Sequence, residues 1–310
     1  MRLIRGHRDL PRQHSGCVVT IGTYDGVHLG HQALLARVRE HAARLGEPSV
    51  LLTFEPMPRE FLDPDDPPPR LTTLRERWQI VSRAGLDYLW LLRFGAALRN
   101  LSADAFAELL ARELRARVVV VGHDFRFGRQ GAATASVLAA AGERLGFTVE
   151  VVPPVTLDGE RISSSAVRAA LARGDFTQAR RWLGRPYSMR GRVIRGERLG
   201  RDLGFPTANL ALGRARSPVA GIFAVQVHGV ADTVRPGVAS LGTRPSVGGR
   251  EVLLEAHVFD FCGDLYGREI EVEFAAKLRD ERHFATLEAL AAQMQRDAAD
   301  ARRILALAGA

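Results

Sequence analysis

Short apolar runs alternate with amphipathic stretches along residues 1–150. The runs are aliphatic or β-branched and are bounded by glycine, proline or polar residues, which predicts buried strands over 17–21, 49–54, 86–92, 117–122 and 147–152. Apolar positions at helical spacing predict helices over 32–45, 74–84, 103–114 and 134–145. Thr73 with Glu76 has the capping-box pattern, and Ser102 is a predicted N-cap. The alternation predicts a doubly wound α/β domain with a parallel sheet.

The pattern changes after Ser163. Two short helical patterns, 166–173 and 176–183, end at a Gly-Arg-Pro turn, and residues 187–274 then show short runs rich in Val, Ile and Phe between glycine turns. One long helical pattern follows over 286–307. We therefore expect a small antiparallel β-barrel with a terminal helix, and a division into domains 1–185 and 186–310.

The charge of the chain changes this picture in one respect. Of 43 basic residues only Lys277 is a lysine, and no glycine loop precedes it, so a P-loop for nucleotide phosphates is excluded. The net charge of +8 is local, because residues 161–201 hold 11 arginines and two acidic residues. This local excess raises the alternative of a nucleic-acid-binding regulator. The aromatic residues do not interleave with the arginines, and no nucleic-acid-binding motif is present, so no nucleic-acid partner is expected.

Cysteine content and hydropathy bear on the compartment. Cys17 and Cys262 form no CxxC pair, so neither a disulfide framework nor a cysteine zinc site is predicted. No apolar run approaches the length of a membrane span, and residues 1–14 lack the apolar region of a signal peptide. We expect a cytoplasmic location and no membrane partner; the sequence leaves the oligomeric state open.

A glycine-rich segment with two histidines follows the first predicted buried strand and leads into a helix. Glycines let backbone N–H groups approach a phosphate, and the helix N-terminus and imidazoles suit charge that develops on an α-phosphate. A glycine turn with surface histidines is the alternative. The candidate residues of this segment are Gly22, Asp25, Gly26, His28, Gly30 and His31.

A second polar segment, 158–165, precedes a predicted helix. Its hydroxyl groups, its backbone N–H groups and Arg161 suit the β- and γ-phosphates of ATP in the absence of a lysine. A simple N-cap role for Ser163 or Ser164 is the alternative.

Two further candidate groups lie in the second half. Thr207 and Asn209 are two residues apart in an extended segment, so they share a face and offer hard neutral ligands for Mg²⁺. Local backbone hydrogen bonding is the alternative. Residues 251–259 alternate, with Glu255 on the polar face, where a carboxylate suits a general base; a solvated strand face explains the alternation equally well.

The motifs together resemble those of the bacterial bifunctional riboflavin kinase/FAD synthetase family. The first half carries Thr53-Phe54-Glu55-Pro56, Arg70-Leu71-Thr72-Thr73-Leu74 and Val121-Gly122-His123-Asp124-Phe125-Arg126-Phe127-Gly128 beside the two segments above. The second half carries Gly200-Arg201-Asp202-Leu203-Gly204-Phe205-Pro206-Thr207-Ala208-Asn209-Leu210, then Gly221-Ile222-Phe223-Ala224, Gly242-Thr243-Arg244-Pro245, Leu254-Glu255-Ala256-His257 and Asp264-Leu265-Tyr266-Gly267. The resemblance covers nearly the whole chain in family order.

The resemblance implies a Rossmann-like nucleotidylyltransferase domain that adenylates FMN to FAD with release of pyrophosphate. In it His28 and His31 would contact the phosphates of ATP, and Arg161, Ser163 and Ser164 would hold the pyrophosphate. Asp124 and Phe125 would shape the flavin cleft. Met57 stands where the family usually has histidine, which motivates the alternative of a riboflavin kinase whose adenylyltransferase domain is weak or inactive. A flavin-sensing regulator is the remote alternative.

The resemblance implies a riboflavin kinase in the second half, which forms FMN from riboflavin and ATP. In it Thr207 and Asn209 would hold Mg²⁺, and Glu255 would be the general base. Gly200 and Arg201 are expected at the ATP phosphates. Arg279 and Phe284, in a run that resembles the family's flavin-side lid, are expected to contact the flavin.

Overall fold

The computed structural model describes residues 1–5, 15–196, 204–246 and 249–308. By their contacts these residues form two compact units: unit 1 comprises Met1–Pro68 and Leu74–Ser163, and unit 2 comprises Pro69–Thr73 and Ser164–Ala310. Among the described residues, no helix has both the length and the apolarity that a membrane crossing requires.

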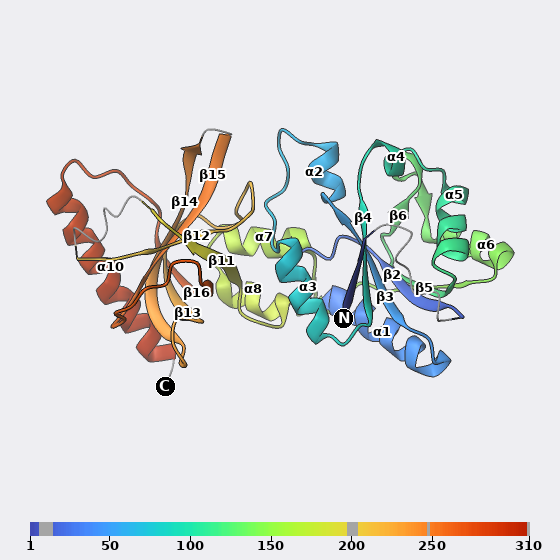
Figure 1. The fold of residues 1–310 in the computed structure, drawn as a ribbon, viewed down its shortest axis with the longest axis horizontal. Helices are drawn as coiled ribbons and strands as arrows, with labels where there is room; N and C mark the ends of the chain where they lie inside the picture. Colours follow the sequence, from blue (N-terminus) through green and yellow to red (C-terminus); the bar gives the residue numbers. More distant parts are fainter. Residues whose placement is uncertain (6–14, 197–203, 247–248, 309–310) are drawn as a thin grey trace. The chain divides into compact units, whose positions relative to one another are not determined.

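Unit 1 is built on a six-stranded sheet in the order β1-β4-β3-β2-β5-β8, in which every pair of neighbours is parallel (Figure 1). The strands are β1 (Arg2–Arg5), β2 (Cys17–Ile21), β3 (Ser49–Glu55), β4 (Tyr88–Arg93), β5 (Ala116–Gly122) and β8 (Thr148–Val152). The doubly wound parallel sheet predicted from the alternation is thus confirmed. The edge strand β1 was not predicted.

Helices cover both faces of this sheet. The apolar sides of α1 (Leu29–Leu45) and α3 (Leu74–Arg83) pack on one face, and α5 (Ala103–Glu108), the π-helical turn η1 (Leu109–Glu113) and α6 (Ala135–Leu145) pack on the other. The hydroxyl of Ser102 accepts from the backbone N–H of Ala105, which confirms the predicted N-cap. Short elements complete the unit: α2 (Pro58–Leu62), α4 (Ala96–Arg99), β6 (Arg126–Phe127), η2 (Arg129–Gly131), β7 (Ala133–Thr134), β9 (Thr156–Leu157) and β10 (Glu160–Arg161).

The strand order places a topological switch point between β2 and β5. The chain leaves β2 toward β3 on one side, whereas β5 and β8 extend the sheet on the other. In open α/β sheets, ligands bind beyond the carboxyl ends of the strands at such a point. The segments that follow β2 and β5, which contain His28 and Asp124, therefore begin at the expected binding edge.

Unit 2 is centred on a closed antiparallel barrel in the order β11-β12-β15-β14-β13-β16, with α10 packed on β13, β14 and β16 (Figure 1). This confirms the predicted barrel and terminal helix. The elements are β11 (Ser188–Ile194), β12 (Ala208–Ala211), β13 (Gly221–His228), β14 (Arg235–Ser246), β15 (Gly249–Val258), β16 (Glu269–Arg279) and α10 (Leu287–Ala308).

Two short helices, α7 (Ser164–Ala172) and α8 (Phe176–Leu183), pack with the barrel, although the sequence pattern placed them in the first domain. The physical reason is an aromatic cluster: the ring of Phe176 lies 5.8 Å from the rings of both Phe223 and Phe274. Helical periodicity predicts the apolar face of α8 but not the surface on which that face packs.

Five residues from the first half of the chain, Pro69–Thr73, also belong to unit 2. Side chains of unit 2 donate to three of their carbonyl groups: Arg168 to Pro69 at 2.7 Å, Arg214 to Arg70 at 3.3 Å and Tyr187 to Leu71 at 3.4 Å. We call Pro69–Thr73 the inserted pentapeptide.

Candidate functional sites

The two predicted histidines lie at the N-terminus of α1. His28 is the N-cap residue, and its Nδ1 accepts from the backbone N–H of His31 at 3.3 Å. The two rings stack with centroids 3.7 Å apart, and His28 is buried. Because Nδ1 accepts, the hydrogen of the neutral His28 ring is on Nε2. A Cβ on Gly30 would lie 3.1 Å from the His28 ring, so this position favours glycine.

The turn before these histidines is tightly shaped. Tyr24 and Val27 have positive φ, as has Gly26 at 81°, and Asp25 is buried within the turn. The ring of Tyr24 lies 4.6 Å from that of His31, and its hydroxyl hydrogen bonds to that of Thr20. Burial raises the pKa of Tyr24, so the phenol stays protonated. Gly22 lies against the Tyr24 ring. The turn thus packs the Tyr24 ring against the His31 ring.

The second predicted phosphate segment comes close to the first within unit 1. The carbonyl oxygen of Ile162 lies 3.8 Å from the position of a Cβ on Gly30. Ile162, between Arg161 and Ser163, is therefore close to the start of α1. Arg161 itself forms an ion pair with Asp124, which follows β5. Ser163 is the last residue of unit 1, and Ser164 begins α7 in unit 2.

Arg77, which the sequence analysis did not single out, is a charged side chain that is fully buried in the described part of unit 1. Its side chain is 0% exposed and donates to the carbonyl of Thr23 and, at 3.3 Å, to the carboxylate of Glu55. Arg77 therefore joins α3 to the turn after β2 and to the end of β3. Its position four residues before the buried Val81, on the inner face of α3, was the available signal.

The candidate kinase residues lie on the outer face of the barrel. Asn209 of β12 and Ser240 of β14 both stand opposite Glu255 of β15, so the three side chains share a face. The flanking Leu254 and Ala256 are 0% exposed, which places the barrel interior on the other side. Strand alternation and pairing therefore bring Asn209 and Glu255 together.

Asn209 has an unsatisfied acceptor. It is 6% exposed, and its Nδ2 donates to the carbonyl of Thr207 at 3.4 Å. Its Oδ1 is buried and has no hydrogen-bond partner in the part of the chain that the structure describes. A Cβ on Gly196 would lie 2.5 Å from the amide of Asn209, so the backbone at Gly196 lies against this side chain. A buried oxygen without a donor fits a cation ligand.

The donor set fits a cation that arrives with a nucleotide. No group of three or more His, Cys, Asp or Glu side chains suited to a metal occurs among the described residues. Thr207 and Asn209 offer uncharged oxygens, so phosphate oxygens would have to balance the charge of Mg²⁺. Gly200 and Arg201, the predicted phosphate contacts, lie outside the described residues.

The predicted flavin contacts are held by neighbours in each unit. Phe125 stacks on Phe127, with centroids 5.5 Å apart, against the core of unit 1. In unit 2, Arg279 binds both carboxylate oxygens of the buried Asp297, and its guanidinium lies 5.7 Å from the ring centroid of Phe284. Arg279 thereby links the end of β16 to α10 and to Phe284.

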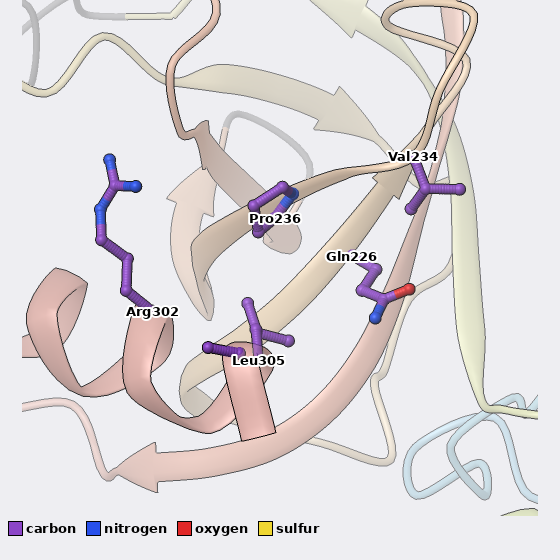
Figure 2. A pocket seen from close by; sticks show the side chains of 6 residues that line it. Gln226, Val234, Pro236, Arg302 and Leu305 are labelled. Carbon is purple, nitrogen blue, oxygen red and sulfur yellow. The ribbon is translucent and has the colours of Figure 1, made fainter. Parts of the chain in front are cut away.

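A separate pocket of about 540 Å³ lies beside the C-terminal part of α10. Figure 2 shows Leu305 of α10 facing Pro236, with Gln226 of β13 and Val234, the residue before β14, nearby. Arg302, at its margin, binds both carboxylate oxygens of Asp260 at 2.8 and 2.9 Å. None of the predicted site residues lines this pocket.

Two protein families match separate parts of the chain. The FAD synthetase family matches residues 10–166, and the riboflavin kinase family matches residues 183–305. A bifunctional riboflavin kinase/FMN adenylyltransferase of Pseudomonas fluorescens is 46% identical over 308 residues, covering 99% of this chain and 98% of the relative. The protein of the same description from Escherichia coli K12 is 43% identical over 309 residues, with 99% of each chain covered.

Among solved structures, a Streptococcus pneumoniae protein described as a macrolide-efflux protein has a TM-score of 0.81 and 30% identity, with 96% of this chain and 97% of that chain covered. The two matched domains and the two folds define a two-domain transferase that forms flavin nucleotides. The chain belongs to the bifunctional riboflavin kinase/FMN adenylyltransferase family.

Proposed function

We propose that the barrel of unit 2 transfers the γ-phosphoryl group of ATP to the ribityl 5′-hydroxyl of riboflavin, which gives FMN and ADP. Glu255 accepts the proton of the attacking hydroxyl, because it is a carboxylate on the outer face beside Asn209. The observation that carries this assignment is the buried Oδ1 of Asn209, an acceptor beside Glu255 for which the described residues supply no donor.

Mg²⁺ fits the same place. The Thr207 hydroxyl and Asn209 Oδ1 would hold it, and it would neutralise charge on the phosphates of ATP. The residues of this chain then orient the phosphates relative to Glu255. Arg201 and Gly200 would contact those phosphates, and Arg279 and Phe284 would face the flavin.

In unit 1, we assign adenylyl transfer to the edge of the sheet beyond β2 and β5. A phosphate oxygen of FMN attacks the α-phosphorus of ATP, the bond to the bridging oxygen breaks, and pyrophosphate leaves. His28 and His31 at the N-terminus of α1 would stabilise the charge on the α-phosphate. The glycine turn with Gly22, Asp25, Gly26 and Gly30 would receive the nucleotide.

The leaving pyrophosphate would be held by Arg161, Ser163 and Ser164, and Asp124 and Phe125 would border the flavin. Arg161 and the segment through Ser163 support this assignment, because the adjoining Ile162 carbonyl comes near Gly30. The alternative with an inactive first domain, motivated by Met57, is not favoured, since the FAD synthetase family matches residues 10–166.

The test is a product time course from riboflavin and MgATP, with variants of each site. Wild type should form FMN and then FAD. Glu255→Ala should form no FMN but should still make FAD from supplied FMN, and the double variant His28→Ala/His31→Ala should do the reverse. Loss of both activities in either variant would contradict two separate sites, and FAD synthesis by the histidine variant would overturn the assignment in unit 1.

A further inference from the structure

His257 connects the candidate kinase base to the candidate metal ligand. It lies two residues after Glu255 on β15 and shares its face. Its Nδ1 lies 2.8 Å from the carbonyl oxygen of Pro206, the residue before Thr207. A carbonyl oxygen only accepts, so Nδ1 carries the hydrogen and donates it. The imidazole therefore binds the backbone next to the threonine.

The His257 side chain lies where the backbone pairing between β12 and β15 ends. Ala208 pairs with Ala256, and this is the end of the β12–β15 ladder toward Pro206. Proline has no N–H and cannot continue the ladder, yet its carbonyl remains an acceptor. The His257 imidazole supplies the hydrogen bond that the strand pairing no longer provides. Thr207 is thus held on one side by the ladder and on the other by His257.

The imidazole is itself held between two aromatic rings. Phe205 packs edge-on against it with centroids 5.2 Å apart, and Phe259 does so at 5.7 Å. The guanidinium of Arg302 lies 4.2 Å from the centroid of Phe259 and is anchored by Asp260. A continuous series of cation–π and edge-on ring contacts therefore runs from α10 through Phe259 and His257 to Phe205, before Thr207.

We propose that His257 is a positioning residue of the riboflavin kinase site, which fixes Phe205-Pro206-Thr207 so that the Thr207 hydroxyl and Asn209 Oδ1 bind one Mg²⁺·nucleotide complex. This inference rests on the proposed metal role of Thr207. His257 acts through the Pro206 carbonyl. Glu255, and not His257, accepts the proton of the attacking hydroxyl of riboflavin.

The test uses replacements that differ in where they carry a donor. His257→Asn places an amide N–H near the position of Nδ1, His257→Gln places one farther out, near Nε2, and His257→Leu has none. Loss of one hydrogen bond corresponds to about a 2- to 10-fold change in an equilibrium constant. His257→Leu should weaken the apparent Mg²⁺ affinity and raise the KM for MgATP by about this factor, with a smaller effect on kcat.

The Asn variant should restore most of the loss, and the Gln variant should not. Calorimetric binding of ADP without riboflavin adds a readout besides activity: His257→Leu should weaken ADP binding with Mg²⁺ present and leave it unchanged in EDTA. FAD synthesis from supplied FMN should stay at the wild-type rate in every variant. His228→Leu, on β13 beside Glu273, is the matched control and should leave the Mg²⁺ dependence unchanged.

An unchanged Mg²⁺ dependence in His257→Leu would overturn the inference, as would an Asn variant no better than the Leu variant. Thr207→Ala tests the proposed metal site separately from the role of His257. If it leaves Mg²⁺-dependent ADP binding unchanged, the proposed metal site is wrong. If it weakens that binding and His257→Leu does not, only the role of His257 is wrong.

Discussion

Arg161 and Asp124 form an ion pair at the binding edge of unit 1, although 37 residues separate them in the chain. Both side chains are at least half exposed, so the pair can open without leaving an unpaired charge buried. We propose that Arg161 holds pyrophosphate and that Asp124 borders the flavin. On that assignment the ion pair would link the binding of the two substrates of adenylyl transfer.

This relationship predicts competition between Asp124 and the phosphates of ATP. Asp124→Asn should bind ATP more tightly in the absence of flavin, because the guanidinium no longer has to leave a carboxylate. Arg161→Ala should raise the KM for ATP in FAD synthesis about 10-fold, the scale of a charge-assisted hydrogen bond. Calorimetry and initial rates measure both effects, and riboflavin phosphorylation is the internal control. Weaker ATP binding by Asp124→Asn would contradict the competition.

The two roles of His28 can be separated by one substitution. Asparagine is a preferred N-cap residue, so His28→Asn should keep the bond to the His31 N–H and the stability of α1. It lacks the imidazole that we propose contacts the α-phosphate of ATP. We expect a urea midpoint like that of wild type and a fall in kcat for FAD synthesis of about 100-fold or more. Near-normal FAD synthesis would mean that His28 is only a cap.

Gly196 predicts a selective loss of kinase activity. An alanine Cβ would lie 2.5 Å from the Asn209 amide, so Gly196→Ala must displace one of the two. A strain of about 1–3 kcal/mol corresponds to a fall of about 5- to 150-fold in kcat/KM for riboflavin phosphorylation. FAD synthesis from FMN should not change. Gly95→Ala, whose added Cβ meets no atom within 4 Å, is the control and should leave both activities intact. Equal behaviour of the two variants would argue against a packed Asn209 site.

Arg77 predicts a combined effect on stability and adenylyl transfer. Arg77→Met removes the donors to Thr23 and Glu55, and loss of these bonds should destabilise unit 1 by about 1–3 kcal/mol. The turn that carries the histidines also loses its support from α3, so kcat for FAD synthesis should fall. Urea unfolding and initial rates measure the two effects. Arg83→Met, at the exposed end of α3, is the control; a similar loss in both variants would contradict a specific role for Arg77.

The pH dependence of stability should involve Glu150 of β8. Hydrogen bonds from Arg37, and then from His41, hold the pKa of Glu150 below its usual range. Its ionised form therefore stabilises the fold above the unfolded-state pKa of about 4.3, and this contribution is lost as pH falls through the lower folded-state value. Glu150→Gln should lower the urea midpoint near neutrality and flatten the fall of that midpoint below about pH 4. Glu143→Gln, an exposed glutamate of α6, should retain the wild-type slope.

Much of the fold followed from the sequence because its signals are local. The buried strands β2, β3 and β5 are nearly continuous apolar runs, and the predicted ranges agree with the observed ones to within one residue. β1 was missed because four residues with two arginines give no apolar run. The packing of α8 on the barrel depends on aromatic residues about 50 and 100 residues away, and periodicity carries no such information.

The candidate sites were predictable to a different degree. Motif order identified the segments of His28, Arg161 and Asn209, and strand pairing then placed Asn209 opposite Glu255. Arg77 and His257 were not assigned roles, because each acts through a backbone carbonyl that tertiary structure alone brings near. The ion pair of Arg279 with Asp297 similarly joins a strand end to a helix.

The inserted pentapeptide has a consequence for dividing this chain into parts. A fragment that began at Ser164 would contain the whole barrel and α10 but would lack the three carbonyl groups that Arg168, Tyr187 and Arg214 bind. Two of these donors are arginines, and desolvating a charged donor without its acceptor is costly. A gene split at that codon would thus encode a barrel without the inserted pentapeptide. The two units are interleaved in the chain and are not simply joined end to end.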